Sequence, residues 1–274
     1  MGRFEGCAAL VTGAGQGIGA AVSRRLASEG AGVTVTDLDG ERAERTAEAI
    51  RAGGGEALAA ACDVRDRQAV EAAVSQAVGH FGRLDVLVNN AYRCSPDAEL
   101  LEDEPDSVWD GDLDTTLSGA FRCARAAMPH LAAAGGRGAI VNVGSVNGIQ
   151  DFGNHAYSAA KAALASLTRT LAGDGGPRGV RVNLVAPGTV RTEAWAGRDA
   201  ALERAAALYP LGRVGRPGDI AAAVAFLASA DAEWITGVTL PVDGGITAVN
   251  SGFQQAMSVP EDPGQGPPSP PVTH

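Results

Sequence analysis

Short apolar runs rich in β-branched residues alternate with longer, alanine-rich segments along most of this 274-residue chain. The longer segments carry polar residues at helical spacing, so the alternation predicts strands that are connected by helices. The short runs are apolar throughout, which is typical of strands buried on both faces of a parallel sheet. We therefore predict an α/β fold with a doubly wound, seven-stranded parallel sheet and helices on both faces.

The pattern also gives the positions of the elements. The predicted strands span residues 8–11, 33–36, 57–61, 86–89, 139–143, 182–185 and 239–242. The predicted helices lie near 18–29, 41–52, 67–80, 106–133, 157–172 and 217–228. Each connection between strands is long enough for a right-handed crossover.

Two stretches depart from this rhythm. Residues 189–211 follow the last crossover strand, and in an open parallel sheet such an insertion lies where ligands bind. A lid over a substrate and an ordinary pair of surface helices both fit this stretch. Residues 259–274 hold six of the 14 prolines. We therefore predict one domain over residues 1–250 and a flexible, proline-rich tail over residues 251–274.

Composition excludes several classes of function. The net charge of −10 opposes binding to nucleic acid or to an anionic membrane, and only 4% of the residues are aromatic. The four cysteines lack the paired spacing of a zinc site, which indicates buried free thiols and no metal. No leader and no apolar run of membrane-spanning length is present, so we expect a cytoplasmic protein with a small-molecule partner.

A glycine-rich turn, Thr12-Gly13-Ala14-Gly15-Gln16-Gly17-Ile18-Gly19, follows the first predicted strand and opens a helix. Its spacing differs from Gly-x-Gly-x-x-Gly, the commonest dinucleotide fingerprint. Glycines here permit close approach of the backbone to a pyrophosphate, and the helix N-terminus adds N–H donors. The location favours a dinucleotide site over a glycine-rich turn without a ligand. The predicted contacts are Gly13, Gln16, Gly17, Ile18 and Gly19.

Asp37 follows the second predicted strand, together with Leu38, at the expected position of the adenosine ribose. Its carboxylate can accept hydrogen bonds from both ribose hydroxyls and would repel a 2′-phosphate. We therefore expect NAD rather than NADP, although Arg42 is a nearby charge that opposes this preference. A cap of the following helix is the alternative role for Asp37.

Polar groups also follow the third and fourth predicted strands. Asp63, which precedes Val64, can accept a hydrogen bond from the adenine amine, or it can cap a helix. Asn89 and Asn90 precede Ala91, and their two amides can tie loops together through bonds to backbone. We expect Asp63, Val64, Asn90 and Ala91 to line the cofactor site.

Tyr157 and Lys161 are four residues apart, so in a helix they lie on one face, one turn from each other. An ammonium beside a phenol favours the phenolate and lowers the pKa of the tyrosine, which suits proton transfer. An isolated Tyr-x-x-x-Lys is common and can be an ordinary helix surface. Here, however, Lys161 is the only lysine among 22 lysine and arginine residues, which indicates that this position requires an ammonium.

Together these motifs resemble the short-chain dehydrogenase/reductase family over roughly residues 3–250, and in particular its 3-oxoacyl-reductase-like and alcohol-dehydrogenase-like members. The resemblance rests on the glycine-rich turn, Asp63, Asn89-Asn90-Ala91, Ser145, Tyr157, Lys161, Asn183, Pro187-Gly188, Pro210-Leu211-Gly212-Arg213 and Val242-Asp243-Gly244-Gly245. It implies a single-domain Rossmann fold.

The resemblance also implies hydride transfer between NAD and a secondary alcohol or ketone. Tyr157 would be the general acid/base, Ser145 would hydrogen-bond the same substrate oxygen, and Lys161 would bind the nicotinamide ribose. The remaining implied cofactor contacts are Tyr157, Pro187, Gly188, Val190 and Thr192.

Two features depart from the family pattern. The family usually has asparagine where this chain has Thr116, and that asparagine helps to hold a water molecule that links the lysine to solvent. We therefore include Thr116 in the catalytic group. We expect the proton path between Lys161 and solvent to differ from that of the family. The loop between Ser145 and Tyr157 is one residue shorter than usual, and Tyr92 replaces the customary glycine.

The substrate pocket is the part that the sequence defines least. The predicted substrate contacts are Ser145, Asn147, Phe152, Tyr157 and Trp195, which suit a ring-bearing hydroxy compound, a polyol or an acyl chain equally well. By resemblance we expect a homo-oligomer, a tetramer or a dimer. The alternative function is a non-catalytic dinucleotide-binding or scaffold protein, which Thr116 favours and the intact Ser145, Tyr157 and Lys161 oppose.

Overall fold

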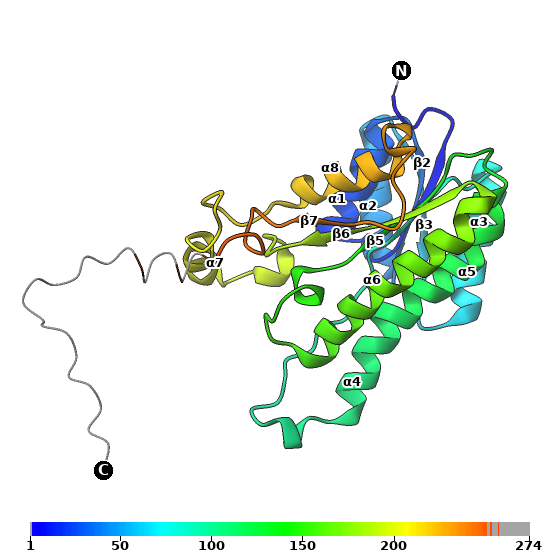
Figure 1. The fold of residues 1–274 in the computed structure, drawn as a ribbon. Helices are drawn as coiled ribbons and strands as arrows, with labels where there is room; N and C mark the ends of the chain where they lie inside the picture. Colours follow the sequence, from blue (N-terminus) through cyan, green and yellow to red (C-terminus); the bar gives the residue numbers. More distant parts are fainter. Residues whose placement is uncertain (1, 251–252, 254–256, 258–274) are drawn as a thin grey trace, which may run out of the picture.

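A seven-stranded parallel sheet forms the centre of the molecule (Figure 1). The structure is a computed structural model that describes residues 2–250, 253 and 257; the rest of the predicted tail lies outside these residues. The strands are β1 (Ala8–Val11), β2 (Gly32–Asp37), β3 (Glu56–Ala61), β4 (Val86–Asn89), β5 (Gly138–Val143), β6 (Val180–Pro187) and β7 (Thr239–Val242). All seven predicted strands are therefore confirmed, several with longer ends.

The strand order is β3-β2-β1-β4-β5-β6-β7, and every neighbouring pair is parallel. The chain starts at β1 in the middle of the sheet, builds outward to β3, and then returns to β4 on the other side of β1. Ligands of doubly wound sheets bind where the order reverses, at the carboxyl ends of the strands. The fold therefore directs a ligand to the crevice above β1 and β4.

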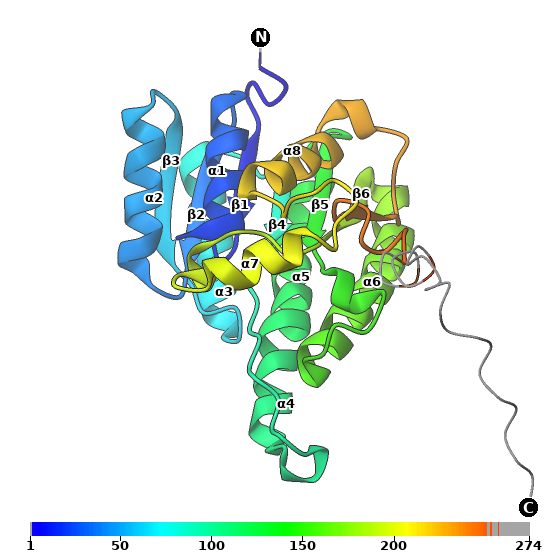
Figure 2. The same ribbon diagram turned by 90° about the vertical axis from the view of Figure 1, so that its left-hand side faces the viewer.

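Helices cover both faces of the sheet (Figure 2). On one face lie α1 (Gly17–Ser28), α2 (Gly40–Ala52) and α8 (Pro217–Ala228), whose apolar sides pack with β1 and β2 in one buried cluster. On the other face lie α3 (Arg67–Phe81), α5 (Gly119–Ala132) and α6 (His155–Gly175). The predicted α/β fold with a doubly wound, Rossmann-like sheet in a single domain is confirmed.

The helix predicted over 106–133 is interrupted. It consists of α4 (Asp106–Leu113), a π-helical turn (Asp114–Ser118) and α5. Such π-turns are rare, lie mostly inside α-helices and are frequent at functional sites. No feature of the sequence indicates this turn, because its residues continue the helical pattern of their neighbours.

Residues 189–211 form an irregular segment at the carboxyl ends of the strands, as expected. It contains a 3₁₀ turn (Glu193–Trp195) and the short helix α7 (Asp199–Ala206). Leu202, Tyr209 and Val214 form a small buried cluster under it, with Trp195 packed against them. The segment therefore has an apolar core of its own.

The cysteines are free but not uniformly buried. Cys62 and Cys123 are buried, Cys7 is half-buried and Cys94 is exposed, so the prediction of buried thiols is wrong for Cys94. Within residues 2–250, 253 and 257, no helix is long and apolar enough to cross a membrane. The same residues contain no group of three or more His, Cys, Asp or Glu side chains arranged to hold a metal ion.

Candidate active site

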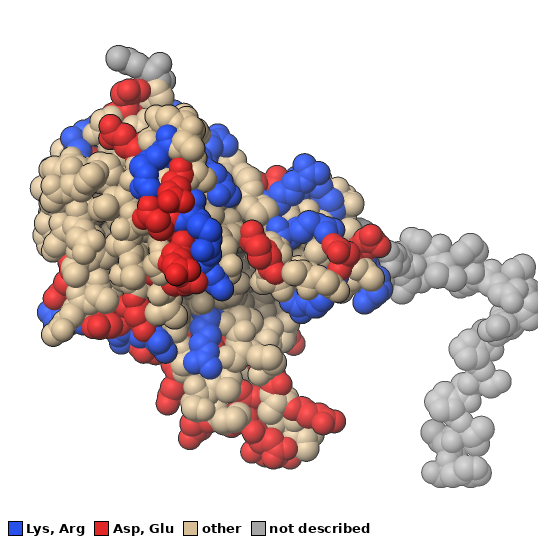
Figure 3. Space-filling model, turned by 180° about the vertical axis from the view of Figure 1, so that it is seen from behind, with Lys and Arg blue, Asp and Glu red and all other residues tan. Residues whose placement is uncertain are grey.

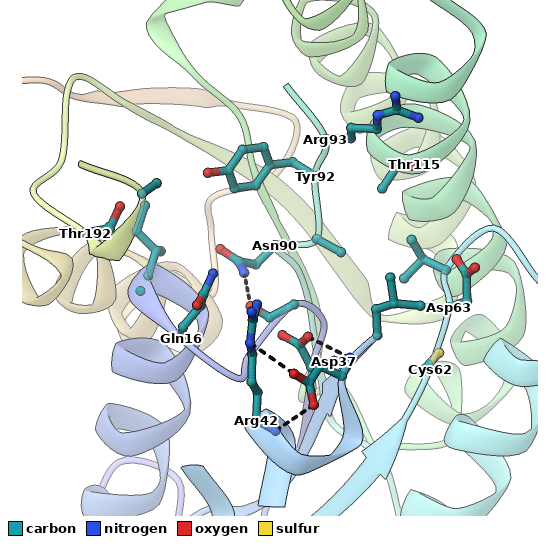
Figure 4. Close-up of a pocket in the computed structure, with 18 of the residues that line it drawn as sticks. Gln16, Asp37, Arg42, Cys62, Asp63, Asn90, Tyr92, Arg93, Thr115 and Thr192 are labelled. Atoms are coloured by element: carbon teal, nitrogen blue, oxygen red, sulfur yellow. Dashed lines mark hydrogen bonds and ion pairs between the residues drawn. The ribbon is translucent and has the colours of Figure 1, made fainter. Parts of the chain in front are cut away.

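A cavity of about 650 Å³ opens at the carboxyl ends of β1 to β4, where the topology directs a ligand. Figure 4 shows Asp37 and Arg42 at one end of it and Tyr92 at the other. Most of the predicted cofactor contacts line this cavity. They are Gly13, Gln16, Gly17, Ile18, Asp37, Leu38, Asp63, Val64, Asn90, Ala91 and Thr192.

The glycine-rich turn requires glycine for two reasons, which are a left-handed backbone conformation and a lack of space for a side chain. Gly13 and Gly17 have φ values of 58° and 56°, in the left-handed region that side chains rarely adopt. Gly19 does not line the cavity, but a Cβ there would lie 2.4 Å from the carbonyl oxygen of Gly13. Asn90 Nδ2 donates to the carbonyls of Thr12 and Gly13 at 2.9 and 2.8 Å, so its amide ties the β4 loop to this turn.

The N-terminus of α1 faces the cavity without a side-chain cap. Its N-cap residue Gln16 makes no capping hydrogen bond, and the first turn contains no acidic residue. Helices α2 and α3, in contrast, are capped by the carboxylates of Asp39 and Asp66. An uncapped helix N-terminus beside a glycine turn presents N–H donors and a positive dipole end, which fits a pyrophosphate.

Asp37 ends β2 with its carboxylate at the cavity. Its Oδ2 accepts a hydrogen bond from the Gly15 amide at 2.9 Å, and its Oδ1 accepts one from the Asp39 amide at 3.1 Å. Because Asp39 is the residue that caps α2, the capping alternative for Asp37 is wrong. Arg42 pairs with Asp39 at 3.1 Å between Nε and Oδ2, so a carboxylate already neutralises the cation at this end.

Asp63 lies at the adjacent wall of the cavity. Its carboxylate forms a forked ion pair with Arg65, with the closest contact at 2.7 Å, and this guanidinium lowers the pKa of Asp63. Asp66, not Asp63, caps α3, so the capping alternative is also wrong for Asp63. The carboxylate of Asp63 is therefore ionised, and both of its oxygens already accept hydrogen bonds from Arg65.

The catalytic candidates are brought together by β5 and α6. Ser145 follows β5, whereas Tyr157 and Lys161 lie one turn apart near the start of α6. Lys161 is only 3% exposed, and its Nζ donates to the carbonyl of Val143 at 2.6 Å. That Nζ lies 5.4 Å from the centre of the Tyr157 ring.

Burial dominates the electrostatics of this pair. It raises the pKa of Tyr157 above its usual range, although the Ser145 side chain acts in the opposite direction. It also lowers the pKa of Lys161 to about 7. Lys161 is not among the groups that shift the pKa of Tyr157 here, so the expectation that its ammonium lowers this pKa stays a prediction.

A network of hydrogen bonds shapes the short loop between Ser145 and Tyr157. Ser145 Oγ donates to Asn147 Oδ1 at 3.0 Å. Asn147 Nδ2 in turn donates to the carbonyl of Gly153 and to Ser158 Oγ, both at 3.2 Å. Asn147 thus fixes the loop that holds Ser145 near Tyr157. Phe152, another predicted substrate contact, is 40% exposed at the tip of this loop.

Thr116 lies in the π-helical turn and is 1% exposed. Its Oγ1 accepts a hydrogen bond from the Arg93 amide at 3.1 Å and donates one to the Arg93 carbonyl at 3.2 Å. The hydroxyl is therefore engaged with the segment that follows β4, next to Tyr92.

Comparison with known proteins agrees with this arrangement. A family model described as enoyl-(acyl carrier protein) reductase matches residues 13–247. The chain belongs to the short-chain dehydrogenase/reductase family. It is 45% identical to the short-chain reductase protein NovJ of Streptomyces niveus, over 86% of this chain and 92% of that protein.

Two further similarities support membership of the family. The chain is 44% identical to cis-4-hydroxycyclohexanecarboxylate dehydrogenase of Sinomonas cyclohexanicum, over 88% of this chain and 96% of that protein. The crystal structure of gox2181 superposes with a TM-score of 0.85 and 34% identity, covering 90% of this chain and 98% of the other. The chain is therefore an oxidoreductase of a family that uses nicotinamide cofactors.

Not every predicted contact of this short-chain dehydrogenase/reductase reaches the large cavity. Gly188 lines a second cavity of about 210 Å³, whereas Pro187 and Val190 are buried and line neither of the two. Trp195 packs on the cluster beneath α7, with the Arg198 guanidinium 4.3 Å from its ring centre. Trp195 thus contributes to the fold of residues 189–211.

Sequence reasoning missed the residue that positions the catalytic helix. Asp97 Oδ2 accepts a hydrogen bond from the Asn154 amide at 2.8 Å, and Oδ1 accepts one from the His155 amide at 2.9 Å. Asn154 has a left-handed φ of 58° and makes no side-chain cap itself. The carboxylate of Asp97 therefore caps α6 just before Tyr157. No local signal reveals this, because 57 residues separate Asp97 and Asn154.

Proposed function

We propose that this chain is an NAD-dependent oxidoreductase that interconverts a secondary alcohol and a ketone. The observation that carries the proposal is the placement of the only lysine, which is buried one helical turn beyond Tyr157 and hydrogen-bonded to the carbonyl of Val143, two residues before Ser145. Burying an ammonium without a carboxylate partner is costly, so a chain that otherwise uses only arginine would not keep it there without a role. The relative from Sinomonas cyclohexanicum is named a dehydrogenase of a hydroxy compound, cis-4-hydroxycyclohexanecarboxylate, which supports oxidation of an alcohol.

The side chains divide the proton chemistry among them. During alcohol oxidation the phenolate of Tyr157 accepts the hydroxyl proton, and during ketone reduction the phenol returns it. Ser145 Oγ donates to the same substrate oxygen and holds it within reach of Tyr157. Lys161 stabilises the phenolate as an ammonium and would hold the ribose of a bound nicotinamide cofactor. A bound nicotinamide would supply the hydride acceptor or donor.

The cavity fits a dinucleotide with a free 2′-hydroxyl. The uncapped α1 N-terminus and the glycine turn suit the pyrophosphate, and the carboxylate of Asp37 suits the adenosine ribose. Asp37 would repel a 2′-phosphate, and the nearby Arg42 is already paired with Asp39. Both features favour NAD over NADP.

The charge of the surface also favours a small substrate. Figure 3 shows Asp and Glu side chains gathered on the projecting arm that includes α4. The exposed members are Glu99, Glu102, Asp103, Asp106 and Asp110. Such a field opposes nucleic acid or another polyanionic partner near the site.

The decisive experiment removes one hydroxyl group. Tyr157→Phe should lower kcat by more than a hundredfold in an NADH absorbance assay with a panel of secondary alcohols and ketones, because the proton acceptor is lost. Ser28→Ala is the control, since it also removes a hydroxyl but lies exposed at the C-terminal end of α1, whose N-terminus faces the cavity, and it should retain most of the turnover. Equal turnover in wild type and Tyr157→Phe would reject the catalytic assignment. NADH binding without any turnover would support the scaffold alternative.

Cofactor choice is tested separately. Asp37→Ala should weaken NADH binding and narrow the difference in Kd between NADH and NADPH by about tenfold or more, because both the acceptor and the repulsion are lost. Fluorescence titration with each cofactor measures this. Tighter binding of NADPH than of NADH to the wild type would contradict the assignment of Asp37.

We also propose that the chain forms a homo-oligomer, a dimer or a tetramer. Trp109 on α4 and Phe121 on α5 are 43% and 44% exposed, which leaves apolar surface on the helices expected to pair. Light scattering of the purified chain measures its mass directly. The cytoplasmic location expected from the sequence stays a prediction.

A further inference from the structure

Tyr92 stands where the family usually has glycine, and it brings an aromatic ring into the catalytic group. The residue directly follows Ala91 on the segment after β4, and its ring lines the large cavity at the end opposite Asp37 (Figure 4). The ring meets that of Tyr157 edge to face, with centroids 5.9 Å apart and an interplanar angle of 61°. This geometry is a favourable one for two aromatic side chains.

The same ring also faces the buried ammonium. Lys161 Nζ lies 5.6 Å from the centre of the Tyr92 ring and 5.4 Å from that of Tyr157. Both distances are within the range of a cation–π interaction, which is stronger when the cation is desolvated. The two rings therefore flank the ammonium.

The other groups around Lys161 offer little to balance its charge. Nζ donates a hydrogen bond to the Val143 carbonyl on β5, and Cys94, on the segment after β4, raises the pKa of Lys161 but less than burial lowers it. Among the residues that the structure describes, none of the ion pairs involves Lys161, and Asp112 on α4 is paired with Arg93. Besides the Val143 carbonyl, the two ring faces are therefore the groups described beside Nζ that offer it negative potential.

We propose that Tyr92 is a positioning residue of this site. Its ring and that of Tyr157 enclose the Lys161 ammonium, and the Tyr92 ring holds Tyr157 and Lys161 in position relative to each other. The inference deepens the proposed function and rests on it for the role of Tyr157. The face of the Tyr92 ring stabilises the protonated form of Lys161, and the ammonium in turn stabilises the phenolate of Tyr157.

Thr116 fixes the segment that carries this ring. Both backbone polar groups of Arg93, the next residue, are bonded to the Thr116 hydroxyl. Asp112 holds the same segment through the amide and hydroxyl of Ser95 at 2.9 and 2.8 Å. Two of the departures from the family pattern, the side chains of Tyr92 and Thr116, therefore form one unit in space. The Thr116 hydroxyl fixes the backbone next to Tyr92 and so helps to hold the Tyr92 ring in place.

The lone lysine makes a direct test feasible. Protein labelled with lysine carrying ¹³C at Cε gives one side-chain lysine resonance, that of Lys161, and its pH titration reports the pKa of this group without cofactor or substrate. Tyr92→Leu should lower that pKa by about half a unit to one and a half units, because a ring face next to a desolvated cation is lost. Tyr92→Phe should titrate like the wild type, because it keeps the ring.

A matched control and a coupled variant complete the design. Phe121→Leu removes an exposed ring that lies 5.4 Å from the Arg125 guanidinium, away from the cavity, and should leave the Lys161 titration unchanged. Thr116→Val should shift the titration in the same direction as Tyr92→Leu. In the double variant the two shifts should not add, because both act through one ring.

Activity gives a second readout. In alcohol oxidation, the pH at which kcat/KM rises should move upward in Tyr92→Leu and stay in place in Tyr92→Phe, because a neutral lysine stabilises the phenolate less.

An unchanged Lys161 titration in Tyr92→Leu, or an equal shift in Tyr92→Phe, overturns the inference. Fully additive shifts with Thr116→Val overturn the coupling of the two residues. If the wild type turned over no alcohol or ketone, the proposed function would fail while the titration still decided the contact of Tyr92 with Lys161.

Discussion

Removing the carboxylate of Asp97 should weaken the start of the helix that carries Tyr157 and Lys161. In the structure this carboxylate accepts two backbone hydrogen bonds, at 2.8 and 2.9 Å, from Asn154 and His155. Asp97→Ala leaves both amides without their partner and removes a negative charge from the positive end of α6. The first helical turn should then fray, two residues before Tyr157.

The magnitude follows from the two lost contributions. Loss of a capping side chain costs about 0.5–2 kcal/mol, and the charge at the helix end adds about 0.3–1 kcal/mol. The free energy of unfolding should therefore fall by roughly 1–3 kcal/mol, and Tm by about 2–4 °C for each kcal/mol in a domain of this size. Because Tyr157 is displaced, kcat should fall by about tenfold or more.

Thermal unfolding followed by circular dichroism and steady-state kinetics measure the two effects. Asp66→Ala is the matched control, because Asp66 caps α3 through the Gln68 amide at 2.8 Å and α3 carries none of the catalytic candidates. That variant should lose similar stability and keep its kcat. If Asp97→Ala kept both Tm and kcat, or lost no more kcat than Asp66→Ala, the positioning role of Asp97 would be refuted.

Two further substitutions probe the buried lysine and the glycine turn. The folded-state pKa of Lys161, about 7, lies below its unfolded value, so the unfolded chain binds more protons between about pH 7 and pH 10. The free energy of unfolding of the wild type should therefore rise with pH across this window relative to that of Lys161→Met, as measured by urea unfolding. A difference in this free energy that did not change with pH would contradict the burial of a neutral amine. Gly19→Ala should abolish NADH binding or folding, since its Cβ would lie 2.4 Å from the Gly13 carbonyl oxygen and 2.5 Å from Asn90 Nδ2. Wild-type affinity for NADH in a titration of this variant would contradict the close packing of the turn.

Local patterns were sufficient for the sheet and for much of the cavity. The inner strands are mostly apolar runs that are buried on both faces, whereas the edge strands β3 and β7 are partly exposed. Gly13, Asp37, Asp63 and Asn90 each lie within two residues of the end of a strand, so their order along the chain implied their position at the cavity. The interruption of the long helix at Asp114–Ser118 could not be predicted, because its residues continue the helical pattern. The raised pKa of Tyr157 could not be predicted either, because desolvation depends on what surrounds the phenol.

The sequence by itself determined the parallel α/β fold and placed Tyr157 and Lys161 on one helix face, because both follow from periodicity and spacing within single elements. Only the tertiary structure decided which distant side chains serve that helix. Asp97 caps it from 57 residues away, and Tyr92 and Thr116 meet beside Lys161 from two different elements. Contacts of this kind depend on how elements pack across the end of the sheet, and no local pattern along the chain records that packing.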